Sequence, residues 1–209
     1  DISGRVRTGK VMLYNPENGR RIKEPHNYIT WVHSLLKKEN FNLRQCLFGE
    51  HLLSSDQQRP VALVESEKSA LISSFYLPQY LWIASGGKNG AFNRDAMSVL
   101  RNRRVLLFPD LGATDYWNSK IEMIRSLGIE VSLFDFMERN ATKEERDAGY
   151  DIADFLLREE TKDAIFNRLI TLNPALKTLV ETLDLQLVNV EKAPLSATVP
   201  HTRKGLFKR

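Results

Sequence analysis

The chain has 209 residues with a formal net charge of +4, and its 42% hydrophobic and 27% charged content is ordinary for a globular protein. No apolar run approaches the ~20 residues needed to span a bilayer, and the first residues are too polar and basic for a signal peptide, so we expect a cytoplasmic protein without membrane contact. The single cysteine, Cys46, excludes an internal disulfide and a cysteine-based zinc site within the chain.

The first segment, residues 1–57, predicts a small α+β subdomain. Residues 4–24 fit a hairpin whose Pro16–Gly19 turn needs a positive φ at the glycine. Apolar residues at helical spacing predict a helix over 27–40. The hairpin is basic, which favours contact with a phosphodiester backbone, although a solvated surface would look the same. Its candidate phosphate-binding residues are Arg5, Arg7, Lys10, Arg20 and Arg21.

Residues 58–157 alternate between short apolar runs and helical patterns. The expected strands are 61–64, 80–84, 105–108 and 129–134, with helices near 67–75, 94–100 and 115–127 between them. Apolar runs of this length bounded by turns are typical of buried parallel strands. The pattern therefore predicts an α/β domain with a parallel sheet and helices on both faces.

The remaining chain predicts helices rather than strands. Residues 138–149 suit a surface loop or short helix, and 151–158, 163–172 and 174–183 suit helices. We place a C-terminal helical segment at 158–192 and a flexible basic tail at 193–209. Trp31, Trp82 and Trp117 fit core positions better than base-stacking platforms, whereas Tyr14 in the hairpin is a candidate for stacking on a base.

Two acids directly follow expected strands, Glu65 after the first and Asp110 after the third. Ligands of parallel sheets bind beyond the carboxyl ends of the strands, so we expect both acids at one edge. Paired carboxylates there suit a hard cation, Mg2+ or Mn2+. Lys68, on the first helical turn after Glu65, is placed to neutralise phosphate charge in a transition state.

A glycine pair follows the second expected strand, in Ser85-Gly86-Gly87-Lys88. Glycines allow a phosphate or nucleic-acid backbone to approach main-chain N–H groups closely. Gly86, Gly87 and Lys88 are therefore candidate phosphate ligands, with a tight turn as the plainer alternative.

This arrangement resembles the Toprim domain of bacterial primases, topoisomerases and related nucleases. It is most similar to Toprim-like proteins of bacteroidete mobile elements, over roughly residues 58–157. The resemblance implies that Glu65 binds metal or handles a proton in phosphoryl transfer, and that Asp110 is the first acid of an Asp-x-Asp motif. It also implies a primase-like nucleotidyltransferase that binds single-stranded DNA or an RNA–DNA hybrid and works with a helicase or another replication protein.

The chain departs from the family pattern at Gly112, where the second acid of Asp-x-Asp would stand. Two metal ions need several anionic ligands, so one cation is the more natural expectation. Asp151 and Asp154 resemble a short acidic motif of primases and are candidates for the absent ligand, or simply cap a helix. Four interpretations stay open: a primase-like enzyme, a nuclease, an inactive nucleic-acid-binding module, and a domain that uses Asp110 for phosphotransfer to itself.

Overall fold

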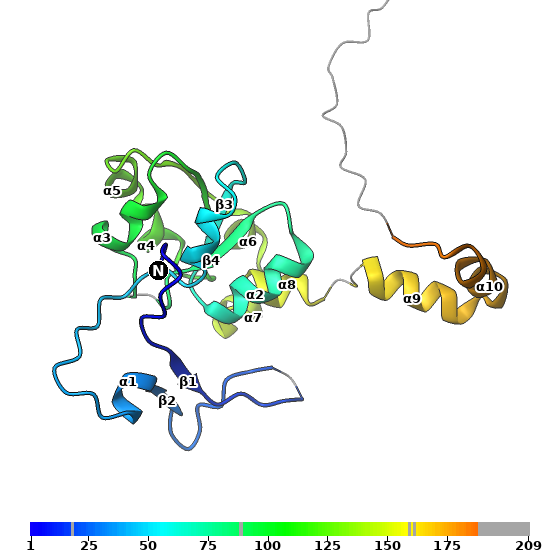
Figure 1. Cartoon of the computed structure of the whole chain (residues 1–209), viewed down its shortest axis with the longest axis horizontal. Helices are drawn as coiled ribbons and strands as arrows, with labels where there is room; N and C mark the ends of the chain where they lie inside the picture. Colours follow the sequence, from blue (N-terminus) through cyan, green and yellow to red (C-terminus); the bar gives the residue numbers. More distant parts are fainter. Residues whose placement is uncertain (18, 88–89, 159, 161, 188–209) are drawn as a thin grey trace, which may run out of the picture. The chain divides into compact units, whose positions relative to one another are not determined.

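The computed structural model describes residues 1–17, 19–87, 90–158, 160 and 162–187. They fall into two compact units, one before and one after the boundary between residues 159 and 160 (Figure 1). The first unit contains the expected basic segment together with the sheet. The expected tail at 193–209 and Lys88 lie outside the described residues.

A four-stranded parallel sheet forms the centre of the first unit. Its strands lie in the order β4 (Leu81–Ala84), β3 (Val61–Val64), β5 (Arg104–Leu107) and β6 (Glu130–Leu133). Every residue of β3 and β4 is buried, which explains why these strands appear in the sequence as uninterrupted apolar runs. The expected parallel sheet is therefore confirmed, with strand ends shifted by one residue or so.

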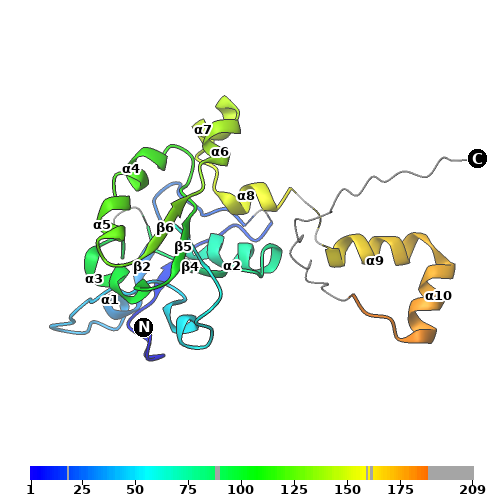
Figure 2. The same ribbon diagram turned by 90° about the horizontal axis from the view of Figure 1, so that it is seen from above.

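Helices cover both faces of the sheet (Figure 2). Val61 and Leu63 point to one core, which they share with Trp117 and Ile124 of the helices after β5. Ala62 and Val64 point to the other core, beneath the helix that follows β3. This alternation is the period-2 geometry of a strand, and it yields the expected three-layer α/β architecture.

The helices of the first unit are short. They are α1 (Val32–Leu35), α2 (Glu67–Tyr76), α3 (Arg94–Met97), α4 (Thr114–Asn118), α5 (Ile121–Arg125), α6 (Phe136–Asn140), α7 (Lys143–Ala148) and α8 (Ile152–Leu156), with 3-10 turns at Glu50–Ser54 (η1) and Ser98–Leu100 (η2). The single helix expected over 115–127 is wrong, because the chain breaks between α4 and α5. Its apolar face is nevertheless buried as expected, and Gly128 ends it with a φ of +77°.

The N-terminal segment differs from the expected hairpin and helix. β1 (Lys10–Met12) pairs antiparallel with β2 (Ile29–Trp31), in a register that places Lys10 opposite Trp31. The expected hairpin is reduced to a single bridge between Tyr14 and Arg21, although Gly19 in its turn does have a positive φ of +63°. The helix over 27–40 is limited to α1, because the β-branched and aromatic residues of β2 take a strand conformation instead.

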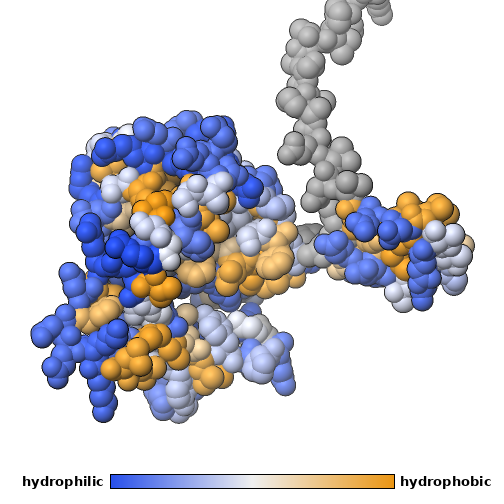
Figure 3. All heavy atoms as spheres, viewed as in Figure 1, coloured by the Kyte–Doolittle hydropathy of each residue, from blue (hydrophilic) through white to orange (hydrophobic). Residues whose placement is uncertain are grey.

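Apolar side chains remain on the surface of the first unit, and Figure 3 shows them over α2 and α8. Phe75 is 81% exposed, and Leu71 and Leu157 are each 55% exposed. Of the helices in the described part of the chain, none combines the length and the apolar character needed to cross a membrane.

The second unit contains α9 (Lys162–Leu172) and α10 (Pro174–Leu183), which pack against each other. The Asn173 side chain accepts a hydrogen bond from the Leu176 N–H at 3.1 Å, and Pro174 stands in the first turn, as is usual at a helix start. The two helices lie where the sequence predicts them.

Candidate metal and phosphate site

The two acids singled out in the sequence lie at neighbouring strand ends. β3 and β5 are hydrogen-bonded partners, with Leu63 opposite Leu107. Glu65 directly follows β3, and Asp110 stands three residues after the end of β5. The chain leaves β3 into α2 on one face and leaves β5 towards α4 and α5 on the other. This divergence creates the crevice at which open parallel sheets bind ligands.

Asp110 has a strongly perturbed carboxyl group. Its Oδ1 atom is buried and has no hydrogen-bond partner. Burial raises the pKa of Asp110 from 3.8 to about 8, assisted by the nearby charges of Glu65, Asp151 and Asp154 and opposed by Lys68. A carboxylate held close to other acids and away from water is the arrangement that a bound cation would stabilise.

The glycine loop after β4 supports Glu65 rather than offering its N–H groups to a ligand. The N–H groups of Gly86 and Gly87 both donate to the carbonyl oxygen of Glu65, each at 3.0 Å. Their φ angles of +79° and +123° explain the need for glycine. In the structure these two N–H groups are used within the fold, so the expected phosphate cradle is replaced by a turn that fixes the backbone of Glu65.

The acids of α8 also have structural partners. Asp151 Oδ1 accepts hydrogen bonds from the N–H groups of Ala153 and Asp154, and its Oδ2 accepts one from the Ser69 hydroxyl at 2.6 Å. Asp154 in turn accepts from the Asp151 N–H at 3.1 Å, which completes a capping box. Asp151 therefore caps α8 and ties it to α2, while its charge still acts on Asp110.

Basic residues of the N-terminal segment form a basic wall of the crevice. A cleft of about 810 Å3 is lined by Arg20, Arg21 and Lys23 as well as by Glu65 and Asp110. Lys68 also lines this cleft, as do Tyr14, whose pKa is raised by burial, and both acids of α8. The chain thus places cations and carboxylates around one opening.

Three other basic candidates have different surroundings. The Lys10 Nζ atom pairs with Glu67 at 2.8 Å and donates to the Gly86 carbonyl oxygen, so it anchors β1 to the loop after β4. Arg5 and Arg7 lie 3.2 and 4.0 Å from Asp1 and line a second pocket, which adjoins the cleft but does not include Glu65 or Asp110.

A carboxylate from α6 approaches the position where the Asp-x-Asp pattern lacks its second acid. Glu138 Oε2 accepts hydrogen bonds from the Gly112 N–H at 2.8 Å and the Thr114 hydroxyl at 3.1 Å. The other carboxylate oxygen pairs with Arg146. Glu138 therefore shapes the loop that carries Asp110, a role for which the sequence offers no signal because the two segments are distant in the chain.

The residues of the crevice suit one divalent cation. Glu65 and Asp110 would hold it, since Asp110 Oδ1 is buried without a hydrogen-bond partner among the described residues and lies close to other acids. In the described part of the chain, no group of three or more His, Cys, Asp or Glu side chains is arranged to hold a metal ion. Water or ligand oxygens would have to complete the coordination, as is usual for Mg2+.

Comparison with known proteins places this crevice within a family. Residues 1–111 match the family described as a domain of unknown function, DUF6371. The chain belongs to the DUF6371 family. No curated protein and no solved structure matches the chain.

The DUF6371 match covers a specific part of the site. It includes the basic segment, β3, β4, β5 and both Glu65 and Asp110, and it ends one residue after Asp110. Asp151 and Asp154 lie beyond the matched DUF6371 region. The pair of strand-end acids and the basic wall are thus both contained in the family domain.

Proposed function

We propose that the chain is a primase-related, Toprim-like protein that binds nucleic acid and a divalent cation for phosphoryl transfer. One observation carries the proposal: the buried, cation-seeking carboxyl of Asp110 faces a cleft whose other wall carries Arg20 and Arg21. A phosphodiester is the ligand that both walls would hold together, since the basic wall attracts its charge and the acids recruit the cation that it shares.

The strand arrangement supports the Toprim-like part of this proposal. A Glu after the first strand of the sheet and an Asp after its neighbour are placed as the resemblance implies. The finer assignment to primases rests on the preceding basic segment, which here packs on the loop after β4 through Lys10.

The proposal assigns a role to five residues of the cleft. Glu65 and Asp110 hold the cation, which neutralises phosphate charge when bound. Lys68 lowers the pKa of Asp110 and adds a positive charge beside the acids. Arg20 and Arg21 orient the strand by binding phosphate oxygens, a geometry for which the guanidinium group is well suited.

The test is binding of a fluorescein-labelled single-stranded oligonucleotide, measured by anisotropy with Mg2+ or with EDTA. We expect Mg2+ to strengthen binding by the unmodified chain, and Asp110→Asn and Glu65→Gln to remove this Mg2+ effect. Exchanging Arg20 and Arg21 for alanine should weaken binding. The slope of log binding constant against log salt concentration should become shallower by about 0.7 for each lost phosphate contact. Arg104→Ala is the matched control, because Arg104 is exposed at the opposite end of the sheet.

Two results would contradict the proposal. One is an affinity that is the same with Mg2+ and with EDTA in the unmodified chain. The other is an Arg20/Arg21 double variant that binds as tightly as the Arg104→Ala control at low salt.

A second candidate function, a nucleic-acid-binding module without catalysis, is favoured by Gly112. Asp151 is committed to capping α8, and this leaves Glu65 and Asp110 as the strand-end carboxylates that the proposal assigns to metal. Incubation with nucleoside triphosphates, Mg2+ and a single-stranded template separates the two candidates. New primer strands indicate the enzyme, shortened template indicates a nuclease, and binding without either product indicates the module.

A further inference from the structure

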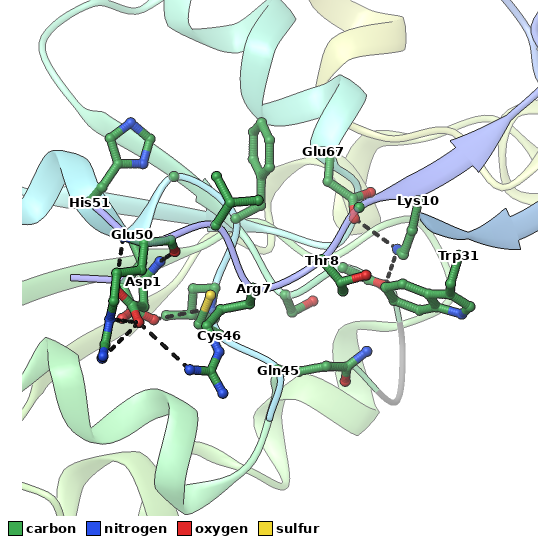
Figure 4. A pocket seen from close by; sticks show the side chains of 18 of the residues that line it. Asp1, Arg7, Thr8, Lys10, Trp31, Gln45, Cys46, Glu50, His51 and Glu67 are labelled. Atoms are coloured by element: carbon green, nitrogen blue, oxygen red, sulfur yellow. Dashed lines mark hydrogen bonds and ion pairs between the residues drawn. The ribbon is translucent and has the colours of Figure 1, made fainter. Parts of the chain in front are cut away.

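A second pocket of about 590 Å3 adjoins the phosphate cleft (Figure 4). Residues 4–10 form one wall and residues 45–51 form another. Trp31 and Met12 also line the pocket, whose surface is largely apolar. Its volume and character are those of a site for a small organic group rather than for a bare ion.

The charged groups at the edge of this pocket have partners of their own. Arg5 and Arg7 share Asp1, and Lys10 is paired with Glu67. The buried Glu50 accepts hydrogen bonds from two backbone N–H groups. The lining between these groups is largely apolar, and it suits an uncharged group.

Two side chains give the pocket the means to recognise a flat heteroaromatic ring. Trp31 is only half-buried, unlike Trp82 and Trp117, which are 3% and 0% exposed. Gln45 is half-buried at the wall, and Figure 4 draws no hydrogen bond from its amide to the residues around it. An indole face offers stacking, and a glutamine amide can donate to and accept from the edge of a base.

The pocket and the phosphate cleft meet at the Lys10–Glu67 ion pair. Lys10, Met12 and Glu67 line both cavities, and the two charged groups lie 2.8 Å apart at the junction. A nucleotide whose phosphate lay in the cleft beside this ion pair would place its base at the apolar pocket.

We propose that this second pocket receives a nucleobase, which stacks on Trp31 and hydrogen-bonds to Gln45. The proposal rests on the proposed function, because the phosphate cleft supplies the anchor for the same nucleotide. The base can belong to the bound single strand or to a free nucleotide, and these two sources share the chemistry that the pocket recognises.

Cys46 provides a direct test, because it is the single cysteine of the chain and lines this pocket. The measurement is its rate of alkylation by iodoacetamide, with Cys46→Ser as the background. The alkylation rate is compared in the presence of an oligothymidylate, an abasic strand of equal length and free thymidine triphosphate. Each is used at a saturating concentration, which anisotropy or calorimetry determines beforehand. We expect the oligothymidylate to slow alkylation several-fold and the abasic strand to leave it unchanged.

The outcomes separate this proposal from the proposed function. Protection by thymidine triphosphate alone assigns the pocket to a free nucleotide, and protection by the oligothymidylate assigns it to the strand. Equal protection by the abasic strand, or strand binding without any protection, overturns the base pocket and leaves the phosphate cleft standing. If neither strand nor nucleotide binds, both proposals fail.

Substitution of the recognition residues gives an independent measurement. Trp31→Leu should weaken binding of the oligothymidylate by about ten-fold, within the range expected for one stacked base, and Gln45→Ala by about five-fold, as expected for one hydrogen bond. Both variants should leave the affinity for the abasic strand unchanged. Gln79→Ala is the control, because Gln79 is an exposed glutamine outside both cavities. An equal loss for both strands would overturn the proposal, and Gln45→Ala keeps the test valid if loss of Trp31 packing unfolds the segment.

Discussion

Exchanging Asp110 for asparagine should make the metal-free protein more stable at alkaline pH. The pKa of Asp110 is about 8 in the folded chain against an ordinary 3.8, so the folded state binds this proton more tightly than the unfolded chain does. Between these two pH values the folded state holds more protons, and its free energy of unfolding therefore falls as the pH rises. Below pH 3.8 the Asp110 carboxyl causes no loss in the free energy of unfolding, and above about pH 8 the loss that it causes is complete.

The structure sets the size of this effect. A pKa difference between 3.8 and about 8 corresponds to a ceiling of about 6 kcal/mol, at roughly 1.36 kcal/mol for each pH unit. Between about pH 5 and about pH 8 the loss attributable to Asp110 is about 4 kcal/mol. Asparagine keeps the size of the side chain and removes the charge, so the variant should lack this component.

The assay is urea unfolding in EDTA at about pH 5 and about pH 8 for the unmodified chain, Asp110→Asn and the exposed-acid control Asp95→Asn. We expect the free energy of unfolding of Asp110→Asn, relative to that of the unmodified chain, to grow by several kcal/mol between the two pH values. Mg2+ should restore the stability of the unmodified chain at the higher pH. If Asp110→Asn and Asp95→Asn follow the same pH dependence, the carboxyl is not held as the structure indicates.

Three further predictions concern the elements that hold the site, and urea unfolding measures each of them. Lys10→Met should cost about 2 kcal/mol because it leaves a partly buried carboxylate unpaired, whereas Lys177→Met, which removes an exposed pair at 3.9 Å, should cost less than about 0.5 kcal/mol. Asp151→Ala should cost about 2 kcal/mol through loss of the α8 cap and of the buried serine hydrogen bond. Gly112→Ala should cost about 1 kcal/mol because of its φ of +81°, and a neutral or stabilising effect would show that the loop does not need glycine there.

The sheet was predictable because its signal is local. Val61–Val64 and Leu81–Ala84 are buried on both faces, so burial leaves uninterrupted apolar runs in the sequence. The segment before the sheet was less predictable. The apolar spacing around Ile29–Trp31 fits a helix as well as a strand, and what decides between them is pairing with Lys10–Met12, a long-range contact that no local pattern records.

The candidate site was also predictable only in part. Glu65 and Asp110 were identifiable because each closely follows a strand, and strand ends converge in a parallel sheet. The partners of the loops were not identifiable, since the carbonyl oxygen of Glu65 takes both glycine N–H groups that the sequence offers to phosphate. Trp31 was assigned to a core, because its place on a pocket wall depends on the strand pairing that the helical spacing concealed.

The absence of an acid at position 112 is consistent with the way the loop after Asp110 is built. Gly112 has a φ of +81°, which an aspartate adopts only with strain, and its N–H is bound to Glu138. The space around its Cα is open, so backbone conformation rather than crowding disfavours a side chain there. The loop therefore presents one carboxylate, Asp110, to the crevice, which is why we propose a single cation shared with Glu65 rather than two.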